Sequence, residues 1–419
     1  MNNINNIIVG LDLGSSFVRT VIGEVLEGGK IEIIGVAQKP SFGLRNGVIV
    51  NRDSVMDCIK KSIEEAEQEA GYEVTSCYAA IGGVQIESTN NKGLVAISSH
   101  GKSPREITDD DIKKVMECAN AIQIPEDKLL LHSIPQNFKI DGTVDCRNPL
   151  GNIAVRLEAK VHTVLASKTV VANIVECIER LGCEIDGIML KTLAAANAVM
   201  LQDERELGSV LIDLGGGTTD VTVINNDAPI CNVSVPVGGN LVTNDIAIVR
   251  GIPLATAEKI KLDYGCCWAD ALEEDCEIVI PGAGGREPEV CRRSEICFGI
   301  IEPRMREIFS LVREEIVNKV NSTLDGNIIL TGGGALMPGV VQLAQDVFGT
   351  CAVRIGFPGD LGGLQEKYRR PDFATAVGLV TGSSGSHIFS RKPVKRSIKS
   401  EKSDGVLNKM WNFIKKNCF

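Results

Sequence analysis

The sequence SVLIDLGGGTTD, at residues 209–220, decides the fold of this chain. It is an apolar run that ends in Asp-x-Gly and continues into further glycines and hydroxyl residues. IIVGLDLGSS, at residues 7–16, repeats the design about 200 residues earlier. Each copy runs into an alternating strand and then, after a turn, into a third strand, at 17–25 and 31–38 in the first copy and at 221–226 and 230–237 in the second. The repeat predicts two similar α/β halves with a cleft between them.

The glycine turns of this repeat are suited to hold phosphate. Glycine lets backbone N–H groups approach an anion and converge on it. Carboxylates at the strand ends would repel a bare phosphate, but they can hold a hydrated Mg²⁺ against it. One such turn alone is usually an ordinary turn, whereas the paired loops and a third glycine turn, TGGGA at 331–335, together predict a clamp for Mg-ATP. The residues expected to bind the cofactor are Asp12, Gly14, Ser15, Ser16, Asp213, Gly215, Gly216, Gly217, Thr218, Thr219, Gly332, Gly333 and Gly334, with Asp12 and Asp213 holding the metal through water.

The periodicity of apolar residues predicts the remaining elements. Helices are expected at 53–70, 109–121, 168–182, 338–348 and 372–382, and over most of 238–276 and 297–323. Strands are expected at 77–83, 129–140, 153–165 and 327–339, with short strands within 277–296. Thr108 is the expected N-cap of the helix at 109–121. Residues 84–163 form a separate small unit in this interpretation.

Composition narrows the class of protein. The net charge of −10 argues against a general nucleic-acid binder. The 14 cysteines include no C-x-x-C pair, which is typical of reduced thiols in a cytosolic protein. The four histidines show no metal-ligand spacing. The N-terminus does not resemble a signal peptide, and no apolar stretch is long enough to span a membrane.

The C-terminal tail differs from the body in charge and pattern. Residues 391–419 contain nine Lys or Arg and two acidic residues, a charge of +7 that leaves −17 on the rest of the chain. Residues 404–419, DGVLNKMWNFIKKNCF, predict a short helix with an apolar face opposite lysines, behind a basic linker. Such a helix suits an anionic membrane surface, although a helix docked on the body or on a partner is the alternative. The expected membrane residues are Leu407, Lys409, Met410, Trp411, Phe413, Ile414, Lys415 and Lys416.

The motifs resemble those of the actin, sugar kinase and heat-shock ATPase superfamily. DLGSS at 12–16 and DLGGGTTD at 213–220 match its two phosphate motifs, and TGGGA matches its adenosine motif. KTLAAANA at 191–198 and FATAVGL at 373–379 resemble its two connecting helices. AEKIK at 257–261 is similar to the helix beside the base, which implies that Glu258 and Lys261 face the ribose and adenine.

Within that superfamily the chain is most similar to the FtsA family of bacterial cell-division proteins. The resemblance runs from residue 6 to 382, resumes in the tail, and adds Gly238, Gly239 and Asn240 to the expected cofactor-binding residues. The segments that carry it are HSIPQNFKIDG (132–142), NPLG (148–151), AKVH (159–162), DEREL (203–207), GGNLVTNDIA (238–247), AEKIKLDYG (257–265) and IEPRMREI (301–308).

This resemblance implies a function in division. It implies a self-assembling, ATP-binding protein that tethers the tubulin-like FtsZ to the inner face of the cytoplasmic membrane, as a peripheral protein at the division site, and recruits later division proteins. Arg304 and Glu307 match positions implicated in docking the FtsZ tail, although they can equally be solvated helix charges. The insert at 84–163 would serve self-association and contacts with later proteins. A pilus-assembly adaptor and a small-molecule kinase of the same superfamily are the alternatives.

The expected domain organisation follows the same pattern. The first core subdomain comprises 1–83, 164–200 and 360–382, with the insert at 84–163. The second core subdomain comprises 201–237 and 310–359, and its outer subdomain is 238–309. A disordered basic linker at 383–403 and the amphipathic helix at 404–419 complete the chain.

Lys191 departs from the superfamily pattern. It stands where actins and heat-shock ATPases have a Gln or Glu that orients the attacking water. A charged lysine has three donors and no acceptor, so it cannot take a proton from water. We therefore expect at most a slow ATPase, with ATP acting mainly as a ligand for conformation and assembly. Local pairing of Lys191, or an alignment shifted by one residue, is the alternative.

Overall fold

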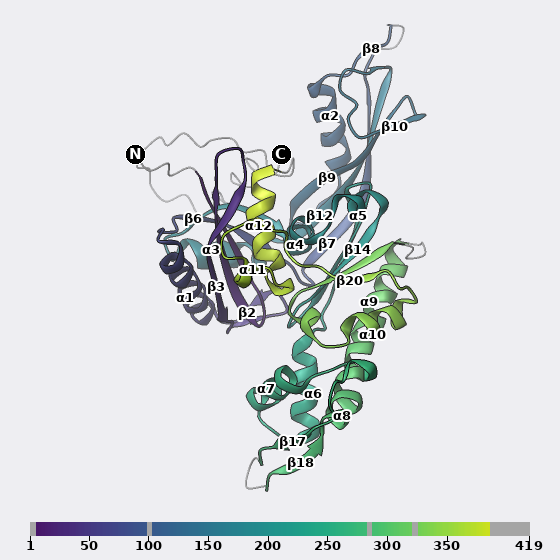
Figure 1. Ribbon diagram of the computed structural model, residues 1–419. Coiled ribbons are helices and arrows are strands. Elements are labelled where there is room, and N and C mark those ends of the chain that lie inside the picture. Colours follow the sequence, from purple (N-terminus) through teal and green to yellow (C-terminus); the bar gives the residue numbers. More distant parts are fainter. Residues whose placement is uncertain (1–5, 99–102, 283–286, 321–325, 386–419) are drawn as a thin grey trace.

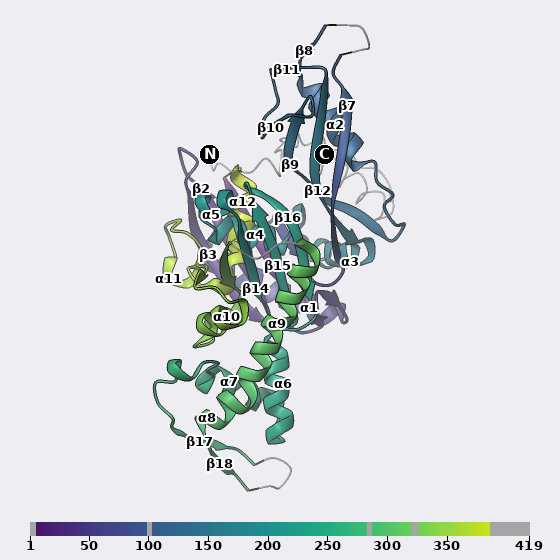
Figure 2. The same cartoon turned by 90° about the vertical axis from the view of Figure 1, so that its right-hand side faces the viewer.

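The structure is a computed structural model that describes residues 6–98, 103–282, 287–320 and 326–385. The molecule is elongated, with two β-sheet halves in the middle, the insert projecting at one end and a helical subdomain at the other (Figures 1 and 2). The expected membrane helix at 404–419 and the linker beyond residue 385 lie outside the described residues. None of the described helices is long and apolar enough to cross a membrane.

The two halves have the same sheet order, which confirms the predicted duplication. The first sheet runs β3-β2-β1-β6-β13 and the second β16-β15-β14-β19-β20. In each, the Asp-x-Gly strand pairs antiparallel with the next strand and parallel with a later one. The strands of the first sheet are β1 (Ile7–Leu13), β2 (Phe17–Val25), β3 (Ile31–Pro40), β6 (Ser76–Ile81) and β13 (Glu184–Leu190). Those of the second are β14 (Ser209–Leu214), β15 (Thr219–Asn225), β16 (Ala228–Val235), β19 (Asn327–Thr331) and β20 (Val353–Ile355).

Amphipathic helices cover the outer faces of these sheets. Helix α1 (Arg52–Ala70) begins where Asn51 accepts a hydrogen bond from the Ser54 N–H at 3.1 Å, and it ends at Gly71 in the left-handed region. Its buried residues recur at helical spacing and join the core of the first half with α3 (Lys168–Glu179). Helices α9 (Glu302–Val320) and α10 (Val340–Phe348) pack on the second half.

Two helices of small residues cross between the halves. They are α4 (Lys191–Val199) and α12 (Ala374–Gly385), and the latter extends into the segment expected to be linker. A Cβ at Gly378 would lie 1.7 Å from the carbonyl oxygen of Ala194, so only glycine fits at this crossing. The crossing joins the halves at the floor of the cleft.

The insert is a four-stranded sheet in the order β10-β9-β12-β7, covered by one helix. Its elements are β7 (Ile86–Ala96), α2 (Asp109–Asn120), β9 (Lys128–Ile140), β10 (Val144–Cys146) and β12 (Arg156–Ser167), with a short pair of β8 (Arg105–Glu106) and β11 (Ile153–Ala154). The predicted cap of α2 is confirmed, since the N–H and hydroxyl of Thr108 donate to Asp111. The sequence interpretation missed β7, because it is a largely polar edge strand with little apolar alternation.

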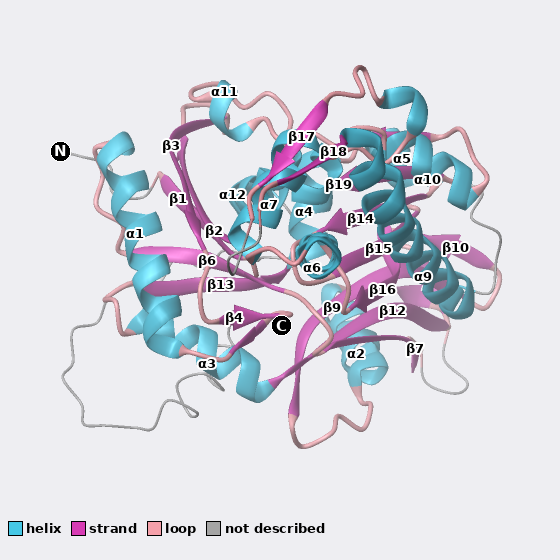
Figure 3. Cartoon of the chain, turned by 90° about the horizontal axis from the view of Figure 1, so that it is seen from below, coloured by secondary structure: helices cyan, strands magenta, loops and turns pink. Residues whose placement is uncertain are grey.

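The outer subdomain of the second half lies at the far end of the molecule, and Figure 3 shows it with α6 nearly end-on. It contains α6 (Gly239–Arg250), α7 (Leu254–Tyr264), β17 (Glu277–Ile280), β18 (Glu289–Arg292), α8 (Arg293–Ile296) and a π-helical turn, Cys297–Ile301, that leads into α9. The remaining elements are the hairpin β4 (Leu44–Arg45) and β5 (Val48–Ile49), α5 (Gln202–Leu207), α11 (Gln365–Tyr368) and 3-10 turns at Ala269–Ala271, Gly333–Leu336 and Pro371–Phe373.

Candidate functional site

A cavity of about 470 Å³ lies between the halves, and both Asp-x-Gly loops line it. The same backbone hydrogen bond closes each loop: Gly14 N–H donates to the Phe17 carbonyl at 3.0 Å, and Gly215 N–H donates to the Thr218 carbonyl at 3.0 Å. A Cβ at Gly14 or Gly215 would lie 2.6 or 2.7 Å from that carbonyl oxygen, so both turns require glycine. The two loops are therefore equivalent in geometry as well as in sequence.

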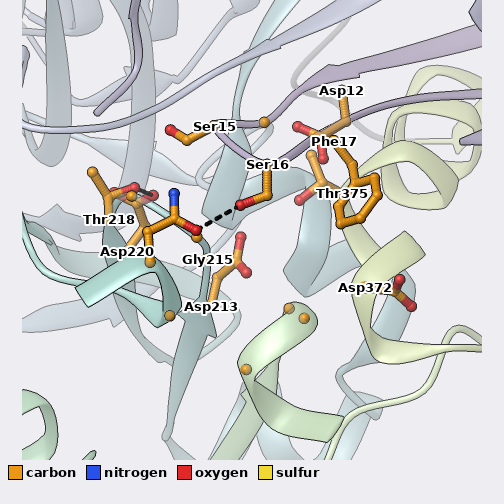
Figure 4. A pocket seen from close by; sticks show the side chains of 18 of the residues that line it. Asp12, Ser15, Ser16, Phe17, Asp213, Gly215, Thr218, Asp220, Asp372 and Thr375 are labelled. Atoms are coloured by element: carbon orange, nitrogen blue, oxygen red, sulfur yellow. Dashed lines mark hydrogen bonds between the residues drawn. The ribbon is translucent and has the colours of Figure 1, made fainter. Parts of the chain in front are cut away.

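The loops face each other across the cleft (Figure 4). Ser16 Oγ donates to Asn240 Oδ1 at 3.0 Å, which links the first half to the start of α6. A Cβ at Gly216 would lie 2.0 Å from Ser16 Oγ, and one at Gly217 would lie 2.7 Å from Ser15 Oγ. The structure thus brings the predicted serines of one loop against the predicted glycines of the other.

The start of α6 supports the second loop. Gly239 and Asn240 donate their N–H groups to the carbonyls of Gly215 and Gly216, at 3.0 and 2.8 Å. A Cβ at Gly238 would clash with those same carbonyls, so this glycine serves close packing and does not line the cavity. These contacts hold the loop in place from behind.

Glu258 and Lys261 both line the cavity from α7. Their side chains form an ion pair at 2.7 Å, and Lys261 also donates to the Gly239 carbonyl at 3.2 Å and to Thr243 Oγ1 at 2.9 Å. Thr243 Oγ1 in turn bonds to Glu258. This network fixes α7 against the loop that carries Gly239.

The third glycine turn packs beneath Asp213. A Cβ at Gly332, whose φ is +82°, would lie 2.2 Å from Asp213 Oδ1. Gly333 and Gly334 continue along the cavity wall. Gly332 N–H and Thr331 Oγ1 both donate to the Pro371 carbonyl, at 3.1 and 2.9 Å, which joins this turn to the segment that leads into α12.

One predicted residue points away from the cleft. Thr219 is fully buried, and its hydroxyl donates to the Val237 carbonyl at 2.8 Å. Its neighbours Thr218 and Asp220 line the cavity instead, because successive residues of a strand face opposite sides. That alternation could have identified Asp220 from the sequence.

Lys191 places an ammonium group among the carboxylates of the cleft. Its Nζ lies 2.9 Å from Asp12 Oδ1. Burial opposes its charge, but Asp12, Asp213 and Asp220 outweigh that effect and raise the pKa of Lys191. Burial raises the pKa of Asp213 to about 7; Lys191 opposes the shift, whereas Asp220 and Asp12 add to it. Asp213 forms no ion pair within the described part of the chain.

This donor set fits a hydrated Mg²⁺, which prefers oxygen ligands and keeps several of its waters. Asp213 is the residue that would hold it, because Asp12 already pairs with Lys191 and both carboxylate oxygens of Asp220 accept hydrogen bonds, from Gly83 and Thr218. The two residues expected to hold the metal therefore differ in this structure: Asp12 pairs with Lys191, whereas Asp213 forms no ion pair in the described part of the chain.

A second ion pair, which the sequence interpretation missed, borders the cavity. Arg19 on β2 pairs with Asp372 at 3.0 Å, and its guanidinium lies over the Phe17 and Phe373 rings at 5.2 and 5.4 Å. Arg370 also pairs with Asp372. Because Arg19 and Asp372 are 353 residues apart, only the folded arrangement of β2 and the turn before α12 (Pro371–Phe373) brings them together.

Arg304 and Glu307 lie near the start of α9. Arg304 forms two hydrogen bonds to Asp245 on α6, at 2.5 and 3.1 Å, and a third to Glu307 at 2.5 Å. Neither residue lines the cavity. They form part of a separate surface between α6 and α9.

Comparison with known proteins agrees with this architecture. The family model described as "Cell division protein FtsA" matches residues 210–378, and that of the "SHS2 domain inserted in FTSA" matches residues 83–165. The chain is 38% identical to the cell division protein FtsA of Borreliella burgdorferi over 416 residues, 99% of each chain. It is 36% identical to that of Escherichia coli over 400 residues, 94% of each chain.

Solved structures show the same actin-like fold at low identity. The PilM–PilN type IV pilus biogenesis complex matches with a TM-score of 0.64 and 17% identity, covering 90% of this chain and 99% of that one. MreB5 of Spiroplasma citri bound to ADP matches with a TM-score of 0.52 and 14% identity, covering 90% of this chain and 96% of that one. Since close relatives match over nearly the full length of the chain, it belongs to the FtsA family of cell division proteins.

Proposed function

We propose that this chain binds ATP with Mg²⁺ in the cleft and that the nucleotide controls its assembly. The observation that carries the proposal is the pair of equivalent loops, which set the hydroxyls of Ser15 and Ser16 against Gly216 and Gly217. The solved MreB5 with this fold holds ADP, which supports a nucleotide as the ligand. A Mg²⁺ bound at Asp213 would supply positive charge beside the phosphates.

Hydrolysis in this proposal is slow. Lys191 occupies the start of α4, and its ammonium pairs with Asp12, so it offers no acceptor for a proton from water. Binding of the nucleotide in the cleft, where it contacts both halves, then affects the protein more than hydrolysis of the nucleotide does. The nucleotide acts as a ligand that favours one arrangement of the halves.

The assembled protein would tether FtsZ to the inner face of the cytoplasmic membrane and recruit later division proteins. FtsA relatives support a role at the division site. The basic amphipathic tail supplies the anchor in this proposal, and self-assembly would strengthen its weak attachment by linking many tails.

The FtsZ tail would dock between α6 and α9. Ile248 and Val249 on α6 are 78% and 63% exposed, and they follow Asp245 at helical spacing on the same side. Asp245 is held by Arg304, so apolar and charged groups lie together on this surface. Such a combination suits a peptide that presents both kinds of side chain.

A pull-down with a peptide of the FtsZ C-terminus tests this proposal. The parent chain should retain the peptide, and Ile248→Ser should weaken binding about tenfold or more, as loss of a central apolar contact does. Val279→Ser is the matched control, because Val279 is 64% exposed in the same subdomain but on β17. Failure of the parent chain to bind, or equal losses in both variants, would contradict the docking surface.

A further inference from the structure

Lys191 reaches its place in the cleft through the arrangement of three parallel strands. β13, β6 and β1 are neighbours in the first sheet; Asp12 lies near the end of β1, and Lys191 directly follows β13 as the first residue of α4. The strand between them, β6, ends at Ile81 and is followed by Gly82. A Cβ at Gly82 would lie 3.1 Å from the Cβ and Cδ of Lys191, so the bare glycine leaves room for the lysine stem to cross β6.

The backbone that carries Lys191 is held on two sides. Thr192 Oγ1 donates to Asn232 Oδ1 on β16 at 3.2 Å. One turn further along α4, Ala194 packs against Gly378 with no space for a methyl group. The lysine side chain is 16% exposed and its partner Asp12 is 5% exposed. The fold therefore fixes the position of the ammonium, unlike that of a lysine on the open surface.

The ammonium faces the same carboxylates that would hold a divalent cation. It pairs with Asp12 of the first half and interacts favourably with Asp213 and Asp220 of the second. Its ion pair with Asp12 leaves N–H donors of the ammonium available for a phosphate that enters the cleft. Two cations that share one set of carboxylates repel each other, so Lys191 and Mg²⁺ compete for this set.

We propose that Lys191 is a built-in cation of the nucleotide site, which binds the phosphates directly and makes nucleotide binding by this chain less dependent on Mg²⁺. The proposal rests on the nucleotide-binding function proposed above. It assigns Asp12 to Lys191 and leaves Asp213 for the metal. With a neutral residue at position 191, Asp12 would be free to hold the metal, and nucleotide binding would depend more strongly on Mg²⁺.

The test measures binding of a fluorescent ATP analogue to the full chain, in saturating Mg²⁺ and in excess EDTA. For the parent chain, removal of Mg²⁺ should weaken binding by less than about tenfold. For Lys191→Gln the same removal should weaken it by about a hundredfold or more, since a charge-assisted contact is lost together with the metal. The Mg²⁺ concentration at half-saturation should also fall in Lys191→Gln, because the competing cation is gone.

Two further variants complete the test. Lys259→Gln is the matched control, an exposed lysine on α7 whose loss should leave the ratio of the two affinities at the parent value. Asp213→Asn should abolish the stimulation by Mg²⁺ that the parent retains, and it keeps the proposal testable if Lys191→Gln does not fold, as checked by circular dichroism.

The outcomes separate the two proposals. A parent chain that binds the analogue only with Mg²⁺ would overturn the role of Lys191 but leave the nucleotide site intact. An unchanged affinity ratio in folded Lys191→Gln would do the same, as would Mg²⁺ stimulation that persists in Asp213→Asn. A parent chain that binds the analogue in neither condition would overturn the nucleotide site itself, and the role of Lys191 with it.

Discussion

Gly378→Ala should destabilise the chain at the crossing of α4 and α12. The added Cβ would lie 1.7 Å from the carbonyl oxygen of Ala194 and 2.3 Å from its carbonyl carbon, whereas ordinary contacts begin at 3.4 Å. The obstacle is backbone inside a buried helix and cannot rotate away. The helices would have to separate by well over an ångström to admit one methyl group.

The expected cost follows from two opposing effects. Overpacking a tight interior typically costs about 1–3 kcal/mol, and a backbone clash belongs at the upper end. Alanine favours a helix interior over glycine by about 1 kcal/mol. The net loss of stability should be about 2 kcal/mol. Because α4 begins with Lys191, the displaced helix should also weaken nucleotide binding.

Denaturation in urea, followed by circular dichroism, measures this effect in the full chain. Gly299→Ala is the control, since Gly299 lies in the π-helical turn before α9 with nothing within 4 Å of the added Cβ. It should keep or slightly raise the midpoint. A Gly378→Ala chain as stable as the parent would refute the tight crossing.

Three further predictions concern the site and the tail. Asp213→Asn should stabilise the metal-free and nucleotide-free chain by about 4 kcal/mol at pH 8. The reason is that burial, together with Asp220 and Asp12, raises the pKa of Asp213 from 3.8 to about 7, although Lys191 opposes this shift. Between those pKa values the folded parent binds more protons than the unfolded chain, so acidification stabilises the parent. The stability difference between Asp213→Asn and the parent should therefore shrink below pH 7. A stability difference that grows in acid would contradict this account. Steady-state ATP hydrolysis should stay below about one turnover per second, and a faster rate would contradict the assigned role of Lys191. Deletion of 404–419 should abolish pelleting with anionic liposomes and preserve nucleotide binding, and pelleting that persists would exclude this segment as the anchor.

The fold was predictable where local pattern and backbone requirement coincide. The repeated Asp-x-Gly hairpins carry both an apolar run and a turn that only glycine permits, so the duplicated sheets were expected. Strand β7 was not predicted because it is an edge strand with little apolar alternation, and its pairing with β12 depends on residues about 70 positions away. Local sequence does not encode such pairing.

The site was predictable in part for the same reason. The glycines and serines of the loops follow directly from the phosphate-binding pattern, and the structure brings them together. Asp220 was missed although strand alternation places it beside Thr218. The pair of Arg19 with Asp372, and the contact of Lys191 with Asp12, arise only when separate strands and helices meet. No residue spacing in the sequence predicts these two ion pairs.

The insert is continuous in sequence with the first half, but it forms hydrogen bonds to the second half. Asn232 on β16 donates its side-chain N–H to Nε2 of the buried His162 at 2.7 Å, and its carbonyl accepts from Ser88 Oγ at 3.2 Å. Both partners belong to the insert. The same Asn232 accepts from Thr192, the neighbour of Lys191. One residue therefore joins the insert, the second half and the helix that presents the cleft lysine.

A second bond crosses at the base of the insert. Gly83 N–H, just before β7, donates to Oδ1 of Asp220 at 3.2 Å, and the other oxygen of Asp220 accepts from Thr218 at 2.9 Å. The insert thus touches the second phosphate loop through a carboxylate that also faces the cleft. A rotation of the halves about the α4–α12 crossing must either carry the insert along or break its bonds to Asp220 and Asn232. The insert and the residue just before it are in this way hydrogen-bonded to the second half at Asn232 and Asp220.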